Sequence, residues 1–194
     1  MNFNVVLFPE FETLDVFGPV EVIGKLENDF KIEFYSQHGG VVQNSNNVRV
    51  ETLPLSDMEK EGVLFIPGGA GIVNEVQNQE LIQLIRELAL HAAFVLTVCT
   101  GSALLAKTGL LKNKSATTNK RLFDWVAEQD KEVQWLKNAR WVRNGKFYTS
   151  AGVSAGIDMT LGFVSDMFGM EIAQQIATRI EYNWNRDNEY RANE

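Results

Sequence analysis

Short apolar runs and helical periodicities alternate along this chain. Continuous runs rich in Val, Ile, Leu and Phe fill residues 4–8, 63–66 and 94–98, and residues 30–35 alternate apolar with polar positions. Continuous runs of this length predict strands that are buried on both faces of a sheet. The alternating run predicts a further strand.

Helical spacing fills the stretches between these runs. Apolar residues three apart within residues 14–23 predict a helix, and Pro19 is expected to kink or break it near Gly18. Gly169 separates the last two helices that the pattern predicts. The remaining predicted helices cover residues 81–91, 103–111, 121–128, 152–167 and 170–182.

Two pairs of short β-rich segments predict hairpins. One pair, residues 41–42 and 48–50, flanks the polar sequence QNSNN. The other pair, residues 140–142 and 146–149, flanks Asn144-Gly145, a strong turn signal. Short strands are also expected at residues 114–118 and 133–136.

Strands that alternate with amphipathic helices predict an α/β fold. Its sheet should be mainly parallel and covered by helices on both faces. We find no repeat, low-complexity tract or linker, so we expect a single domain at residues 1–182. A polar C-terminal tail follows at residues 183–194, and it should be frayed or supported by a partner.

Charge narrows the choice of partners. The 194 residues include 18 Lys and Arg against 25 Asp and Glu, a formal net charge of −7 at pH 7. Negative charge repels phosphate, so we expect neither nucleic acid nor a membrane surface as a partner. The N-terminus lacks the features of a signal peptide. A single cysteine forms no intrachain disulfide, which fits a reducing, cytoplasmic location.

The single cysteine follows a predicted buried strand where a helix is expected to begin. In the sequence Val98-Cys99-Thr100-Gly101-Ser102, a sharp turn would raise the cysteine above the sheet, as in a nucleophile elbow. The positive end of the helix favours thiolate over thiol, so we expect a lowered thiol pKa. The alternative is a small buried hydrophobic residue, but the position after the strand favours a nucleophile.

A glycine-rich segment directly follows another predicted strand. Gly68, Gly69 and Gly71 can present backbone N–H groups to a shared cleft, as an oxyanion site requires. A tight turn is the alternative. Neither a P-loop nor G-x-G-x-x-G is present, so no nucleotide cofactor is expected.

One acid lies among apolar residues after the first strand. Asp15 is either a charge at a helix start or a carboxyl in a semi-buried cleft with a raised pKa. Neither His38 nor His91 is placed to serve as the base of a Cys-His-Asp triad. The same scattered residues offer no metal-ligand spacing, so no metal is expected.

Taken together, these segments resemble the ThiJ/PfpI superfamily, which is related to class I glutamine amidotransferases. Within it, the isocyanide (isonitrile) hydratase-like branch has Cys-Thr at the elbow and Asp after the first strand, here Cys99, Thr100 and Asp15. The resemblance implies a flavodoxin-like three-layer sandwich and a homodimer, to which residues 182–184 could contribute contact. The matching motifs are L-D-x-x-G-P-x-E-V, P-G-G, V-C-T-G-S, A-x-x-G-L-L, A-T-T and S-A-G-I-D.

The chain also departs from the patterns it resembles. Thr100 stands where the protease-like branch has histidine, so a peptidase is not expected. Asn119 and Lys120 follow A-T-T where hydratase-like members have histidine and an aromatic residue. We expect this change to remove a group from the substrate pocket.

The resemblance implies a cysteine-dependent hydratase or hydrolase of a small, uncharged electrophile. Cys99 would attack the terminal carbon of an isonitrile, Asp15 would move protons, and Thr100 would orient the substrate. The backbone N–H groups of Gly69 and Thr100 would stabilise developing charge. Three residues are expected as apolar lining: Phe17, Ile72 and Trp125.

Two other functions remain open. One is glyoxalase-like handling of α-oxoaldehydes, although relatives with that activity have glutamate at the position of Asp15 and a nearby histidine. The other is a non-enzymatic redox or stress sensor in which Cys99 is oxidised to sulfinate.

Overall fold

The computed structural model describes residues 1–26 and 29–187, and its largest sheet has eight strands. The six inner strands run parallel to one another, and each edge strand pairs antiparallel with its neighbour as a hairpin. This confirms the predicted α/β class and both hairpins. The spatial order is β3 (Gly40–Gln43), β4 (Arg49–Pro54), β2 (Lys31–Ser36), β1 (Asn2–Val6), β5 (Val63–Ile66), β6 (Phe94–Thr97), β10 (Phe147–Ser150) and β9 (Trp141–Asn144).

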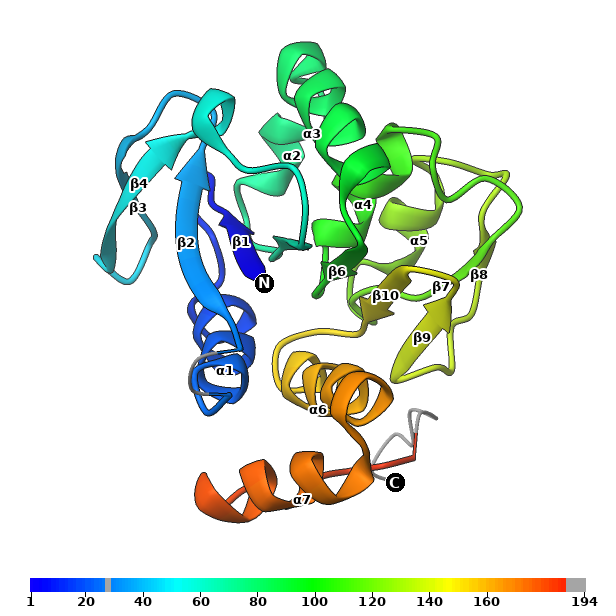
Figure 1. Ribbon diagram of the computed structural model, residues 1–194. Coiled ribbons are helices and arrows are strands. Elements are labelled where there is room, and N and C mark those ends of the chain that lie inside the picture. The colour runs from blue at the N-terminus through cyan, green and yellow to red at the C-terminus, as the bar shows by residue number, and fades with distance from the viewer. Residues whose placement is uncertain (27–28, 188–194) are drawn as a thin grey trace.

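Helices cover both faces of this sheet (Figure 1). One layer consists of α1 (Thr13–Ile23), α6 (Ala155–Phe168) and α7 (Met170–Arg179). The other consists of α2 (Ile72–Glu75), α3 (Gln79–His91), α4 (Gly101–Lys107) and α5 (Phe123–Ala127). The small strands β7 (Ser115–Ala116) and β8 (Gln134–Trp135) pair with each other, and a 3₁₀ turn spans Leu55–Asp57. The arrangement is the expected three-layer sandwich.

Alternating side chains of the central strands fill two separate cores. Phe3 and Val5 of β1 belong to the core that α1, α6 and α7 cover, whereas Val6 belongs to the core that α3, α4 and α5 cover. All three side chains are fully buried. Burying a side chain of this size contributes roughly 1.5–3 kcal/mol, so the central strands hold both helical layers against the sheet.

Of the kink or break predicted at Pro19, the break does not occur. Helix α1 runs without interruption through Pro19. Proline has no N–H for the carbonyl of Asp15 four residues earlier, which costs one helical hydrogen bond. Pro19 is buried, and it packs toward Gly156 of α6. Packing between α1 and α6 therefore keeps the helix whole.

The predicted element boundaries move by a few residues. The first strand ends at Val6 rather than at residue 8. Leu7 and Phe8 are buried, as the apolar run predicts, but they lie in the connection that follows the strand. Helix α7 ends at Arg179, short of the predicted residue 182.

The described part of the C-terminal segment, residues 183–187, docks on the fold. Asn185 donates its backbone N–H to Asp158 Oδ1 over 2.9 Å, and Tyr182 donates its hydroxyl to Asp158 Oδ2 over 3.1 Å. Trp184 packs against the core beneath α6. Residues 184 and 185 are therefore not frayed, and the rest of that tail, 188–194, lies outside the described residues.

None of the helices in the described residues combines the length and apolar character needed to cross a bilayer.

Candidate active site

Cys99 occupies the sharp turn between β6 and α4. Its backbone adopts a left-handed conformation, with φ of 56°. The Cys99 N–H donates to the carbonyls of Ser150 (3.2 Å) and Ala151 (3.3 Å). The Cys99 carbonyl accepts from the hydroxyls of Ser102 (3.1 Å) and Thr118 (2.9 Å). A non-glycine residue in this region is strained, and these four hydrogen bonds hold it there as in a nucleophile elbow.

The residue that begins α4 must lack a side chain. A Cβ at Gly101 would lie 2.4 Å from the carbonyl oxygen of Ile66 and 2.6 Å from that of Pro67. The start of α4 therefore lies directly against the end of β5. This close approach brings the cysteine turn next to the glycine-rich segment after β5.

Asp15 projects from the first turn of α1 into the same place. Its side chain has no exposed surface, and its Oδ2 accepts the backbone N–H of Gly68 over 3.1 Å. Burial raises the pKa of Asp15 to about 7, and the negative charge of Glu12 adds to the increase. Hydrogen bonds from Gly68, Cys99 and Val153 oppose it. The raised pKa is as expected, but the carboxyl is fully buried in the first turn of α1 rather than held in a semi-buried cleft.

The expected lowering of the thiol pKa is wrong. Burial and then the negative charge of Asp15 raise the pKa of Cys99 to about 12, although hydrogen bonds from the Thr100 N–H and Asn119 act in the opposite direction. Helix α4 is only seven residues long, and the cysteine is 7% exposed. Burial therefore outweighs the helix dipole. The sulfur is therefore expected to keep its proton at neutral pH, beside a carboxyl whose own pKa is raised.

Asn119 also lies in this site, although the sequence suggested that a pocket group was lost here. Its Nδ2 donates to Cys99 Sγ over 3.0 Å. Its Oδ1 accepts the backbone N–H groups of Arg121 (2.9 Å) and Leu122 (3.1 Å). The sequence can suggest that an asparagine at a turn binds nearby backbone N–H groups. It does not show that the Asn119 side chain contacts a sulfur twenty residues away.

The three glycines expected at the oxyanion site have different roles. Gly68 uses its N–H on Asp15, and Gly71 donates weakly to the Glu10 carbonyl at 3.4 Å. A Cβ at Gly71 would lie 1.9 Å from the Pro9 carbonyl oxygen, so this glycine is packed against the loop after β1. Gly69 donates to Thr100 Oγ1 over 3.2 Å and faces the cavity. All three N–H groups therefore donate within the protein, and Gly69 is the one of the three glycines that lines the cavity.

A cavity of about 370 Å³ opens onto the sulfur. Its volume is near the lower end for small-molecule sites. Val153 lines it in a left-handed conformation, with φ of 52°, which is rare for a β-branched residue. The lining residues are Glu12, Gly69, Ala70, Cys99, Thr100, Asn119, Arg121, Leu122 and Val153.

The predicted apolar lining is wrong. Phe17 packs against Phe34, with ring centroids 6.4 Å apart. Ile72 has no exposed surface and belongs to the core under α3 and α4, against which Trp125 also packs. These side chains follow helical faces into the two cores, so the cavity wall is built by loop residues instead.

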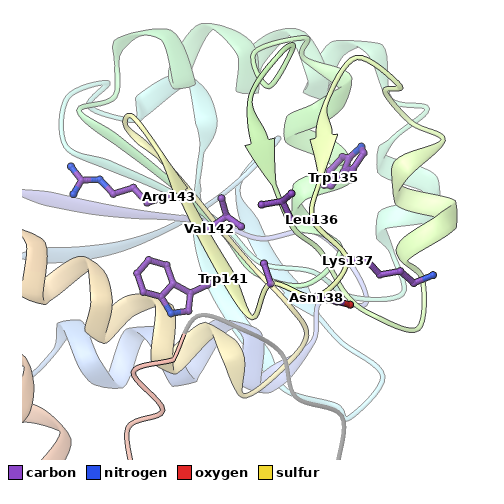
Figure 2. Close-up of a pocket in the computed structure, with 8 residues that line it drawn as sticks. Trp135, Leu136, Lys137, Asn138, Trp141, Val142 and Arg143 are labelled. Carbon is purple, nitrogen blue, oxygen red and sulfur yellow. The ribbon is translucent and has the colours of Figure 1, made fainter.

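A larger hollow of about 590 Å³ lies elsewhere, between β8 and β9. Figure 2 shows Leu136, Trp141 and Val142 around it, with Lys137 and Arg143 extending away from its centre. Cys99 lines the smaller cavity and not this hollow, and Asp15, which has no exposed surface, lines neither. We therefore place the candidate active site at the smaller cavity.

The two histidines lie outside the site. His91 Nδ1 contacts the Glu87 carbonyl at 2.9 Å, at the end of α3, and His38 lines a different cavity after β2. Within residues 1–26 and 29–187, no three His, Cys, Asp or Glu side chains gather as metal ligands would. The chemistry available is that of a thiol at the cavity, the buried Asp15 carboxyl that contacts it, and fixed hydrogen-bond donors.

Sequence comparisons identify relatives with different activities. The chain is 31% identical over 183 residues to an isonitrile hydratase from Pseudomonas putida, covering 94% of this chain and 78% of that protein. It is 28% identical over 182 residues to the HTH-type transcriptional regulator CdhR from Pseudomonas aeruginosa. That match covers 91% of this chain and 53% of the regulator.

Solved structures share the fold. A ThiJ/PfpI family protein from Pseudomonas syringae aligns with a TM-score of 0.85 and 26% identity, covering 95% of this chain and 76% of that one. Drosophila melanogaster DJ-1beta aligns with a TM-score of 0.79 and 21% identity over 94% of this chain and 98% of its own. A family model, DJ-1/PfpI, matches residues 2–166. On this match, this chain belongs to the DJ-1/PfpI family.

Proposed function

We propose that this protein hydrates small isonitriles, converting R–N≡C and water into the N-substituted formamide R–NH–CHO. The observation that carries the proposal is the Cys99 thiol, which lines a 370 Å³ cavity and contacts the fully buried Asp15 carboxyl, whose pKa is raised to about 7. Similarity to the P. putida isonitrile hydratase supports the choice of reaction. General acid–base catalysis works best with a group whose pKa lies near the working pH, which describes this carboxyl.

In the first half of the reaction, sulfur adds to the terminal carbon of the isonitrile. The Asp15 carboxylate takes the thiol proton as the Cys99 Sγ–C bond forms, and it delivers that proton to the same carbon. The product is a thioimidate, Sγ–CH=N–R. Because the thiol pKa is raised, proton transfer to Asp15 accompanies the attack, and no standing thiolate is needed.

In the second half, water replaces sulfur. The Asp15 carboxylate accepts a proton from water as its oxygen adds to the thioimidate carbon, and the proton passes to the nitrogen. The C–S bond then breaks, its electron pair returns to Cys99, and the hydroxyl proton returns to sulfur through Asp15. Gly69 and Thr100, which line the cavity, hold the substrate during both halves.

The proposal is tested by following hydration of p-nitrophenyl isocyanide by the purified protein and its variants. Cys99→Ala should abolish turnover, and Asp15→Asn should lower kcat by about 10²–10⁴ because it removes the proton carrier. Asp57→Asn, at an exposed position, is the matched control and should behave as wild type. Equal rates for Cys99→Ala and wild type would reject the nucleophile.

The same protein samples separate the other functions. Turnover of methylglyoxal without turnover of any isonitrile would favour the glyoxalase-like reaction. A sensor would take up two oxygens under mild peroxide, seen by intact mass, and would turn over neither substrate. The raised thiol pKa argues against easy oxidation, since the thiolate is the reactive form.

A further inference from the structure

One side chain donates a hydrogen bond directly to the candidate nucleophile. The Nδ2 of Asn119 lies 3.0 Å from Cys99 Sγ. The other end of this amide is fixed, because Oδ1 accepts the backbone N–H groups of Arg121 and Leu122. A 180° rotation of the Asn119 amide would place its NH₂ group against the N–H donors of Arg121 and Leu122, which is unfavourable. Nδ2 therefore faces the sulfur.

The surrounding backbone leaves little freedom for this contact. A Cβ at Gly152 would lie 2.4 Å from Asn119 Nδ2 and 3.6 Å from Cys99 Sγ. The glycine therefore makes room for the amide at the sulfur. Asn119 is therefore fixed next to the Cys99 sulfur by the backbone of its own loop and by close packing against Gly152, which precedes α6.

From this geometry we propose that Asn119 is a catalytic residue that stabilises negative charge on Cys99 Sγ. The inference rests on the function proposed above and adds a group to it. The charge appears when the C–S bond of the tetrahedral intermediate breaks and its electron pair moves to sulfur. A donor already placed at the sulfur needs no rearrangement at that moment.

An amide suits this position because it does not titrate. An imidazole at the same place would gain or lose a proton near neutral pH and add a second ionisation to the rate profile. With Asn119 as the donor, the group at the sulfur adds no ionisation of its own to the rate profile, which should follow Asp15. The donor then acts equally at every pH at which the protein is folded.

Thiol alkylation tests the contact without relying on isonitrile turnover. Cys99 is the only cysteine, so the rate of carbamidomethylation by iodoacetamide between pH 7 and 9 reports on this sulfur alone. Asn119→Asp keeps the acceptor for Arg121 and Leu122 but replaces the donor with negative charge. Asn119→Leu is similar in shape to asparagine and removes the donor without adding charge, together with the Oδ1 acceptor of the Arg121 and Leu122 N–H groups.

Both variants should alkylate more slowly than wild type, by about tenfold or more, the usual effect of a hydrogen bond to a charged group. The aspartate variant should be the slower of the two. Asn138→Asp makes the same charge change at an exposed position and should react as wild type. Thermal melts establish which variants are folded.

A folded Asn119 variant that alkylates at the wild-type rate would overturn the proposal. The hydration assay is read separately, and kcat should fall in the same order as alkylation. If alkylation follows this order but no protein hydrates any isonitrile, the donor role at sulfur stands and the proposed function fails.

Discussion

At the scale of single residues, the charge of Glu12 helps to set the proton affinity of Asp15. Glu12 precedes α1, lines the cavity and raises the Asp15 pKa through its negative charge. The proposed mechanism needs the Asp15 carboxylate to accept the thiol proton. We therefore expect kcat/KM to rise with pH through about 7, the Asp15 pKa, and then to reach a plateau.

Replacing Glu12 tests this electrostatic link. Glu12→Gln should lower the Asp15 pKa and move the rising limb of the kcat/KM profile to lower pH, with the plateau little changed. Glu21→Gln removes the same charge from the exposed side of α1, where Glu21 pairs with Lys25, and should leave the limb in place. A limb that stays fixed in Glu12→Gln would show that Asp15 does not control it.

Sequence patterns at this scale identify residues better than protonation states. Cys99 and Asp15 are identified from their positions after predicted strands, and the fold brings their two side chains together. The thiol pKa is predicted in the wrong direction because the helix dipole is visible in a sequence, whereas burial depends on the whole fold. The contact of Asn119 with the sulfur escapes the pattern for the same reason, since it joins segments that are distant in sequence.

At the scale of elements, the turn from β6 into α4 depends on Gly101. Gly101→Ala should lower the free energy of unfolding by about 3 kcal/mol, because its methyl group meets fixed backbone rather than a mobile side chain. It should also reduce hydration, since the start of α4 positions the sulfur. Urea denaturation midpoints measure the change in stability.

Gly145→Ala is the control for this prediction. Gly145 lies in the β9–β10 turn at φ of 61°, with no atom within 4 Å of a built Cβ. Its cost should be the conformational strain of about 1–2 kcal/mol, without an effect on kcat. Equal losses of stability in the two variants would contradict the close packing of α4 against β5.

Element prediction succeeds where local signals agree with burial. The run at residues 63–66 and the turn at Asn144-Gly145 appear where the pattern places them. Pro19 does not break α1, because a rule about proline alone leaves out the packing of α1 against α6. The predicted lining of the cavity is wrong for the same reason. Helical spacing identifies the apolar face of a helix, but it does not show whether that face packs into a core or lines a cavity.

At the scale of the whole molecule, alternating strands and helices are enough to predict the layered fold and the edge that carries the site. Carboxyl ends of parallel strands meet at one edge of a sheet, so the order of elements along the chain already groups Asp15, Gly69 and Cys99. Docking of residues 182–185 is not predictable in this way. It depends on Asp158, a carboxyl with no exposed surface that pairs with Arg140.

This buried carboxyl joins the C-terminal segment to the rest of the molecule. Arg140 Nε donates to Asp158 Oδ2 over 2.8 Å, the same oxygen that accepts from Tyr182. Asp158→Asn should lower the free energy of unfolding by about 3–5 kcal/mol, because it leaves the Arg140 charge without its partner. Tyr182→Phe removes one hydrogen bond and should cost only about 1 kcal/mol. Urea midpoints for both variants measure this difference, and an Asp158→Asn protein as stable as Tyr182→Phe would contradict the larger cost expected for breaking the ion pair.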